Sequence, residues 1–82
     1  MKEKQIALAL LVNNNPGVLS RIAGLFARRG YNIDTITAGA TNDSNYTRIT
    51  VAVTGDDDIL EQIRKQIGKL EDVVKIIELY DK

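Results

Sequence analysis

The sequence predicts an α+β domain in which strands and helices follow one another in the order β-α-β-β-α-β. Four segments have the apolar content or the alternation typical of strands, and two further segments repeat apolar side chains at three- and four-residue spacing. Length and composition agree with this class, because 82 residues with 44% hydrophobic and 27% charged side chains are typical of one small globular domain. We therefore expect a single domain over residues 1–82.

Residues 5–12 are expected to form the first strand, because bulky apolar side chains alternate there with mostly small ones. The bulky positions are Ile6, Leu8, Leu10 and Val12. A helix follows, with Asn15 as its expected N-cap and Pro16 and Gly17 as its first two residues. Its apolar stripe comprises Val18, Leu19, Ile22, Leu25 and Phe26. Gly30 is expected to end this helix in the left-handed conformation.

A hairpin is expected next, with strands at residues 31–40 and 46–54 joined by a turn-forming segment at 41–45. The apolar face of the later strand is predicted to comprise Ile49, Val51 and Val53. The earlier strand is ambiguous, because Ile33 and Ile36 fall on opposite faces of a regular strand. Both assignments of its buried face therefore stay open.

Residues 55–70 contain the second predicted helix, followed by a last strand at 73–80 whose irregular alternation indicates a β-bulge. The apolar stripe of the helix comprises Ile59, Leu60, Ile63, Ile67 and Leu70. Consecutive carboxylates at residues 56–58 are typical of a helix start, where they stabilise the positive end of the dipole. A metal cluster is the alternative, but the sequence offers no further obvious ligand for it.

Right-handed crossovers place both helices on one face of an antiparallel four-stranded sheet, which is the ferredoxin-like arrangement. The opposite face of the sheet is then uncovered. Its expected residues on the strands that can be oriented are Ala7, Ala9, Leu11, Thr50, Ala52 and Thr54. Because these side chains are small or moderately apolar rather than charged, they indicate self-association.

Composition argues against several classes of function. The chain has 11 basic and 11 acidic side chains, and zero net charge disfavours a general polyanion binder. It has no cysteine and no histidine, which removes disulfides, thiolate or imidazole metal sites and most acid–base catalysis. RNA binding is disfavoured because neither central strand carries an aromatic side chain. The apolar run at residues 6–12 is too short to span a membrane, and we expect a cytoplasmic protein.

The segment NNNPG at residues 13–17 concentrates turn and cap residues at the start of the first helix. Helix N-termini present unpaired N–H groups, and Gly17 would let a ligand approach the backbone closely. Three asparagines offer hydrogen-bond donors and acceptors, and Asn32 stands at the start of the next strand. The carboxylate and ammonium of a free amino acid would suit this corner. The alternative is a turn and cap without a ligand.

The run PGVLSRIAGLFARRGYNID at residues 16–34, together with LEDVVKI at 70–76, resembles the ACT domains of the regulatory small subunits of acetohydroxyacid synthase, also called acetolactate synthase. The resemblance covers nearly the whole chain. It implies a non-catalytic subunit of branched-chain amino-acid biosynthesis that activates a catalytic large subunit and confers feedback inhibition, commonly by valine. It places thiamine diphosphate, magnesium and FAD on the large subunit and no cofactor on this chain.

Carried over by position, the resemblance implies that Asn14, Gly17 and Val18 hold the carboxylate and ammonium of the amino acid. Asn32 would come from the second subunit of a homodimer in which two sheets pair side by side. The residues implied to line the pocket for the ligand side chain are Leu19 and Ile36.

Many members of this family have a second domain of similar size after the ACT domain, whereas this chain resembles the single-domain type or else is a piece of a longer member. Sensitivity to valine is therefore not implied for every member. Two alternatives remain. One is a free-standing amino-acid-binding protein, and the other is a purely structural assembly module that binds no metabolite.

Overall fold

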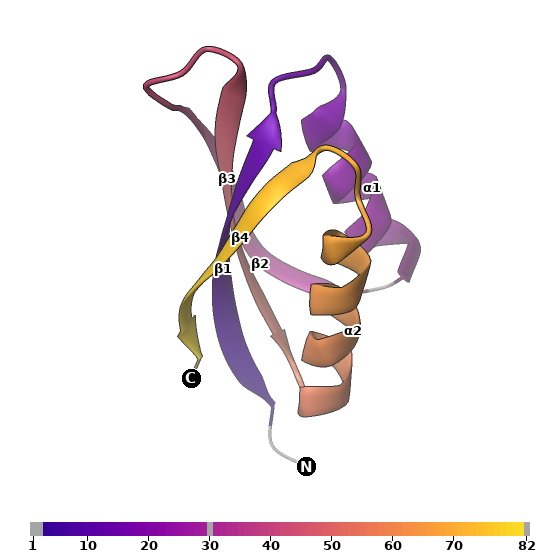
Figure 1. The fold of residues 1–82 in the computed structure, drawn as a ribbon. Helices are drawn as coiled ribbons and strands as arrows, with labels where there is room; N and C mark the ends of the chain where they lie inside the picture. The colour runs from indigo at the N-terminus through magenta and orange to yellow at the C-terminus, as the bar shows by residue number, and fades with distance from the viewer. Residues whose placement is uncertain (1–2, 30, 82) are drawn as a thin grey trace.

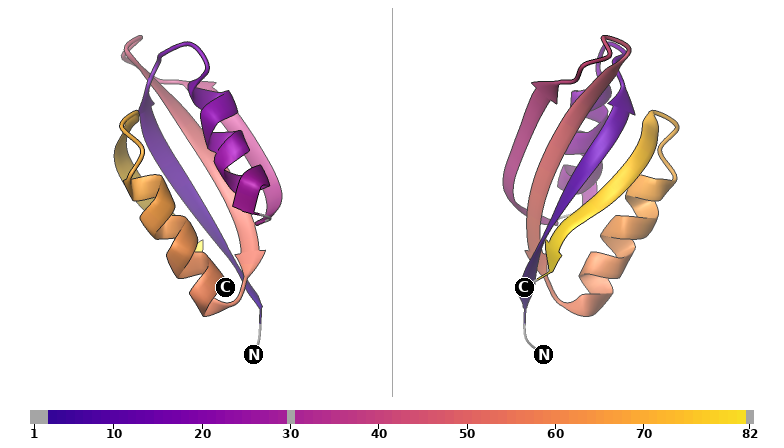
Figure 2. Two further views of the ribbon diagram at one scale, coloured as in Figure 1. Left: turned by 90° about the vertical axis from the view of Figure 1, so that its right-hand side faces the viewer. Right: turned by 60° about the vertical axis from the view of Figure 1, so that its left-hand side comes forward.

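The computed structural model describes residues 3–29 and 31–81 and shows the predicted order of elements (Figure 1). The elements are β1 (Lys4–Asn13), α1 (Val18–Arg29), β2 (Asn32–Ala40), β3 (Tyr46–Gly55), α2 (Asp57–Gly68) and β4 (Val73–Asp81). The strand order is β2-β3-β1-β4, and every neighbouring pair is antiparallel. Both helices lie on one face of the sheet (Figure 2), so the predicted ferredoxin-like α+β fold is confirmed. The role predicted for Gly30 lies outside the described residues.

The core fills the space between the two helices and the covered face of the sheet. Alternate residues of the central strands β1 and β3 meet one apolar face of each helix there. The buried side chains of this cluster are Ile6, Leu8, Leu10, Val12, Val18, Ile22, Leu25, Phe26, Ile49, Val51, Val53, Leu60, Ile63 and Ile67. Leu19 is an exception to the predicted stripe, because 42% of its surface is exposed. It lies on the side of α1, outside the stripe that faces the sheet.

β2 resolves the ambiguity that the sequence left open. Its register with β3 shifts directly after Ile33, so that Asp34 is an extra residue in the strand. The shift interrupts the alternation, and Ile33 and Ile36 both pack against the core as a result. Asp34 accepts hydrogen bonds from Gln5 Nε2 (2.7 Å) and Thr54 Oγ1 (2.5 Å). A regular strand would have placed one of the two isoleucines on the uncovered face.

β4 is an edge strand with two register shifts against β1, which confirms the irregularity predicted for the last strand. The extra residues are Val74 and Leu79, of which 52% and 53% are exposed. Ile76 and Ile77 between them are also partly exposed. This edge strand therefore exposes four large apolar side chains.

The uncovered face carries the small side chains predicted for it. Ala7 pairs with Ala52, and Ala9 pairs with Thr50, at the centre of this face. Toward one end lies a shallow groove of about 240 Å³, lined by Ala9, Leu10, Leu11, Thr41, Arg48, Lys75 and Ile77. Across the part of the chain that the structure describes, no helix is long and apolar enough to cross a membrane.

The acidic start of α2 has the capping role that the sequence favoured. Asp56 is the N-cap, and its Oδ1 accepts a hydrogen bond from the Ile59 amide at 2.9 Å. Asp57 forms an ion pair with Lys4 Nζ at 2.9 Å. Within residues 3–29 and 31–81, no group of three or more histidine, cysteine, aspartate or glutamate residues could hold a metal ion.

Candidate functional site

The loop between β1 and α1 is built around a tight turn at Pro16 and Gly17. The Val18 amide donates to the Asn15 carbonyl at 3.3 Å, and Gly17 has a φ of +81°. Proline followed by a glycine with positive φ is typical of a type II turn. α1 begins at Val18, so Pro16 and Gly17 precede the helix instead of forming its first two residues as predicted. Only glycine adopts this backbone conformation without strain.

The start of α1 leaves amide donors open. The Gly17 carbonyl accepts the first helical hydrogen bond, from the Arg21 amide at 2.9 Å. In the described part of the chain, no group accepts a hydrogen bond from the amides of Leu19 and Ser20. The first turn contains no acidic residue. Two N–H groups at the positive end of the helix dipole are thus available to an anion.

Asn15 does not cap α1, and this corrects the prediction from the sequence. Its side-chain Nδ2 donates to Asp72 Oδ1 at 3.0 Å, across the gap between the loop and the start of β4. The turn at Pro16 displaces Asn15 from the capping position, because Gly17 is now the residue that precedes the helix. Asn15 therefore anchors the loop to another element instead of satisfying the helix.

Asn14 is held by the hairpin that joins β2 and β3, whereas Asn15 is held by Asp72. Its main-chain amide donates to the Asn45 carbonyl at 2.8 Å, and its Nδ2 donates to the Ser44 carbonyl at 3.1 Å. Its Oδ1 accepts from Thr47 Oγ1 at 2.9 Å. An amide side chain has two donor hydrogens on nitrogen and two acceptor lone pairs on oxygen. One hydrogen on Nδ2 and one lone pair on Oδ1 are therefore left for a ligand.

Asp72, which the sequence analysis did not single out, joins the loop to β4. Its carbonyl accepts from the Asn13 amide at 2.8 Å, and its Oδ2 is paired with the guanidinium of Arg21. The hydrogen bond from Arg21, supported by that from Asn15, lowers the pKa of the Asp72 carboxyl below its ordinary value. The sequence signal for this residue was its place in LEDVVKI, but no spacing rule connects it to the loop.

The structure brings four of the six predicted site residues together. Asn14 and Gly17 lie in the loop, Val18 begins the helix with its side chain buried, and Leu19 is exposed beside it. Ile36 lies in the middle of β2, pairs with Val51 and packs against the core. It is not adjacent to the loop within one chain.

Asn32 is remote from the other predicted site residues. It is exposed and pairs with Thr54, near one end of β3, whereas the loop is bonded to Thr47, near the other end. At about 3.3 Å per residue, these two positions on β3 are roughly 23 Å apart. One copy of the chain therefore cannot place Asn14 and Asn32 around the same small ligand.

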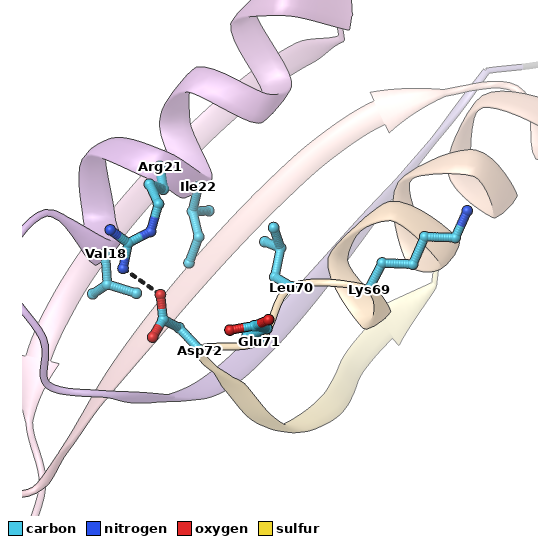
Figure 3. Close-up of a pocket in the computed structure, with 7 residues that line it drawn as sticks. All are labelled: Val18, Arg21, Ile22, Lys69, Leu70, Glu71 and Asp72. Carbon is cyan, nitrogen blue, oxygen red and sulfur yellow. Dashed lines mark hydrogen bonds and ion pairs between the residues drawn. The ribbon is translucent and has the colours of Figure 1, made fainter.

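A cavity of about 420 Å³ lies between α1 and the turn that connects α2 to β4 (Figure 3). Its lining residues are Val18, Arg21, Ile22, Lys69, Leu70, Glu71 and Asp72. The ion pair between Arg21 and Asp72 lies along one side. Only Val18 is shared with the predicted site. Arg21 and Leu19 project about 160° apart around the helix, so the cavity and the exposed flank of α1 are on opposite sides.

Residues 8–75 match the family model described as the AHAS small subunit-like ACT domain. The probable acetolactate synthase small subunit of Archaeoglobus fulgidus is 49% identical over 72 residues, which cover 88% of this chain and 45% of the relative. The acetolactate synthase isozyme 3 small subunit of Escherichia coli (strain K12) is 47% identical over 72 residues, covering 88% and 44%. The chain spans about half the length of the curated relatives that it matches.

Solved structures show the same likeness. The acetolactate synthase small subunit from Thermotoga maritima superposes with a TM-score of 0.81 at 44% identity, over 95% of this chain and 47% of that one. The ACT domain from the GTP pyrophosphokinase of Chlorobium tepidum has a TM-score of 0.78 at only 18% identity, over 96% and 89% of the two chains. The second similarity concerns the fold alone.

Proposed function

Because the chain belongs to the family of AHAS small subunit-like ACT domains, we propose that it is an amino-acid-sensing regulatory module of acetohydroxyacid synthase. It would bind a feedback amino acid, with valine as the first candidate, and act on a separate catalytic large subunit. The observation that supports this most is the loop ahead of α1, where Gly17 at a φ of +81° precedes open helix amides. A coupling of this kind is typically about 1 to 3 kcal/mol.

The loop has the donors and acceptors that a zwitterion requires. The open amides of Leu19 and Ser20 would receive the carboxylate at the positive end of the helix dipole. The remaining acceptor capacity of Asn14 Oδ1 would receive the ammonium. Gly17 has no side chain to obstruct the approach of the ligand to the backbone.

The distance between Asn14 and Asn32 supports a site shared by two copies. β2 is an edge strand, and two β2 edges can pair antiparallel about a two-fold axis near Ile36, the central residue of the strand. The start of one β2 then lies beside the end of the other. That end leads into the hairpin that holds Asn14. Such a homodimer would bring Asn32 of the second copy to the loop of the first.

The same arrangement assigns the pocket for the ligand side chain. Leu19 projects away from α2 and from the cavity beside Arg21, toward the flank of α1 where a second copy would lie. Pairing about Ile36 places both copies of that residue near the axis. Leu19 would contact the ligand side chain directly, and Ile36 would form the floor between the two sites. A branched aliphatic side chain fits such surroundings.

In this proposal the chain performs no chemistry of its own. Thiamine diphosphate, magnesium and FAD belong to the large subunit, and no residue here is assigned to them. The ligand would act by binding one arrangement of the dimer better than another, which shifts the population that the large subunit contacts.

The proposal is tested by calorimetric titration of the purified protein with L-valine, L-leucine, L-isoleucine and L-serine, with light scattering in the same buffer. We expect saturable binding of a branched aliphatic amino acid by a dimer, with two equivalent sites per dimer. Binding by a monomer would contradict the shared site. The absence of heat with all four amino acids from a folded dimer would contradict the sensing function.

A structural assembly module is the second candidate, and the apolar edge at β4 favours it. Val74, Ile77 and Leu79 are each about half exposed, which is unusual for an edge strand in a monomer. This candidate predicts that the large subunit binds and is activated without any metabolite. The titration separates the two, because only the sensing module gives a heat of binding.

A further inference from the structure

The loop at residues 13–17 is held by hydrogen bonds on two sides rather than by apolar packing. The hairpin holds it on one side through Asn14. On the other side, the contacts at Asn13, Asn15 and Arg21 all converge on Asp72. Because residues 14–17 are exposed and belong to neither β1 nor α1, their conformation depends on these bonds.

The three acceptor atoms of Asp72 each contact a different residue in or beside the loop. Its carbonyl receives the Asn13 amide at the end of β1, and Oδ1 receives Asn15 Nδ2 just before the turn. Oδ2 is paired with the Arg21 guanidinium in the first turns of α1. The carboxylate is therefore bonded on both sides of the turn at Pro16 and Gly17, to Asn15 before the turn and to Arg21 after it. The Asp72 side chain is 19% exposed, against 54% for the side chain of Arg21.

Arg21 extends the influence of Asp72 to Gly17. The Arg21 amide donates to the Gly17 carbonyl at 2.9 Å, and its Nη1 lies 3.7 Å from the position that a Cβ on Gly17 would occupy. In the described part of the chain, Asp72 is the one carboxylate paired with Arg21. The Arg21 side chain is 54% exposed, so this pair is what orients its guanidinium beside Gly17.

We propose that Asp72 is a positioning residue of the amino-acid site, which holds the loop at residues 13–17 in its ligand-binding conformation through Asn13, Asn15 and Arg21. The inference rests on the proposed function and assigns Asp72 no contact with the ligand. It also connects the site to the start of β4. A displacement of the loop on ligand binding would reach β4 through the same carboxylate.

The test compares Asp72→Ala and Asp72→Asn with the wild-type protein. Both variants keep the main-chain bond to Asn13, because it uses the carbonyl of residue 72. Asp72→Ala removes both side-chain contacts, whereas Asp72→Asn keeps an acceptor for Asn15 and loses the charge that pairs with Arg21. We expect the Kd for L-valine to rise more than tenfold in Asp72→Ala and by a smaller factor in Asp72→Asn.

Glu78→Gln provides the matched control. Glu78 lies within β4 and, like Asp72, is paired with a helix arginine, Arg64 Nη2 at 3.1 Å, but this arginine belongs to α2 and not to the helix that follows the loop. This variant should leave the Kd unchanged. Thermal unfolding is measured for every variant, because an effect on global folding alone would shift the midpoint without changing the Kd of the folded protein.

Amide hydrogen exchange supplies a second measurement that needs no ligand. The Arg21 amide, which is bonded to the Gly17 carbonyl, should exchange faster in Asp72→Ala, whereas core amides of β1 and β3 should keep their protection. Glu78→Gln should leave the exchange rate at Arg21 as it is in the wild type. Unchanged exchange at Arg21 in Asp72→Ala would overturn the proposed connection.

The outcomes separate this inference from the proposed function. If the wild type and Asp72→Ala bind L-valine equally well, Asp72 is not a positioning residue and the sensing function stands. If Asp72→Ala binds more weakly but Glu78→Gln is weakened to the same extent, the effect is not specific to the loop and the inference is again wrong. If the wild type binds none of the four amino acids, the sensing function fails and the role of Asp72 fails with it.

Discussion

Asn14 and Asn32 occupy opposite ends of the same sheet, because Asn14 Oδ1 accepts a hydrogen bond from Thr47 Oγ1 whereas Asn32 pairs with Thr54. The roughly 23 Å between these positions on β3 is several times the size of an amino acid. If both asparagines contact one ligand, they must come from different copies of the chain. The proposed site therefore depends on a homodimer in a way that can be tested without a structure of the complex.

Mixing two inactive variants should restore binding. We expect Asn14→Ala and Asn32→Ala each to lose affinity for L-valine, because every site in either homodimer lacks one asparagine. After the two are unfolded together and refolded in equal amounts, half of the dimers carry both variants, and one of their two sites is intact. About a quarter of all sites should then bind with wild-type affinity, as measured by calorimetry.

The double variant Asn14→Ala with Asn32→Ala, mixed with either single variant, is the control, because no combination of these chains contains an intact site. A site within one chain predicts no recovery in the first mixture. Recovery in the control mixture would show that the asparagines are not ligand residues.

Gly17→Asp and Gly17→Asn separate charge from backbone strain. Both residues must adopt the φ of +81°, at a similar cost of roughly 1 kcal/mol. Among the residues that the structure describes, a Cβ there meets only Arg21 Nη1, at 3.7 Å. Asp would also place a negative charge where the ligand carboxylate is proposed to bind. We expect calorimetry to show reduced but measurable binding of L-valine in Gly17→Asn and none in Gly17→Asp. Equal affinities in the two variants would contradict the position assigned to the carboxylate.

Gly55→Ala and Gly68→Ala should change stability in opposite directions. A Cβ on Gly55 would lie 2.8 Å from Ile59 Cγ2 and 3.0 Å from Ile59 Cβ, so the first turn of α2 must move. Overpacking of this kind typically costs about 1 to 3 kcal/mol. A Cβ on Gly68 meets no atom of residues 3–29 and 31–81 within 4 Å, and alanine at this helical position should add about 0.5 to 1 kcal/mol to the free energy of unfolding. Urea unfolding of the two variants gives both changes in the free energy of unfolding.

The sequence predicted most of the fold because its apolar periodicities are regular. The alternation at Leu8 and Val51 and the three- and four-residue spacing at Ile22 and Ile63 place these side chains in the core that the structure shows. β2 was the exception. A bulge at Asp34 cannot be derived from alternation, because the side chains that donate hydrogen bonds to its carboxylate, Gln5 and Thr54, belong to other strands.

The candidate site was predictable only where its residues are consecutive. Pro16 and Gly17 predict a turn from sequence alone. The structure places this turn before the helix, whereas the two residues were predicted to be the first of the helix. The partner of Asn15 could not be predicted, because Asp72 is 57 residues away and ordinary helix-capping preferences favour a local bond. The role proposed for Asn32, as a ligand residue from a partner subunit, follows from the family resemblance and not from the strand register.

Stability at acidic pH should depend on Asp34 and Asp72. Hydrogen bonds from Gln5 and Thr54 lower the pKa of Asp34 below its ordinary value of 3.8, and those from Arg21 and Asn15 lower the pKa of Asp72. A carboxyl whose pKa is lower in the folded than in the unfolded chain stabilises the fold fully above the unfolded value. That contribution is lost as the pH falls through the lower pKa of the folded protein.

We therefore expect the urea midpoint of the wild type to decrease as the pH falls below about 4, through protonation of carboxylates that are hydrogen-bonded in the folded state. Asp34→Asn and Asp72→Asn should each have a lower midpoint than the wild type at pH 7 and a shallower decrease below pH 4. The difference between each variant and the wild type should shrink toward the acid end, because protonation removes the same charge that the substitution removes. A difference that stays constant from pH 7 to pH 2.5 would show that these carboxylates do not stabilise the fold in their ionised form.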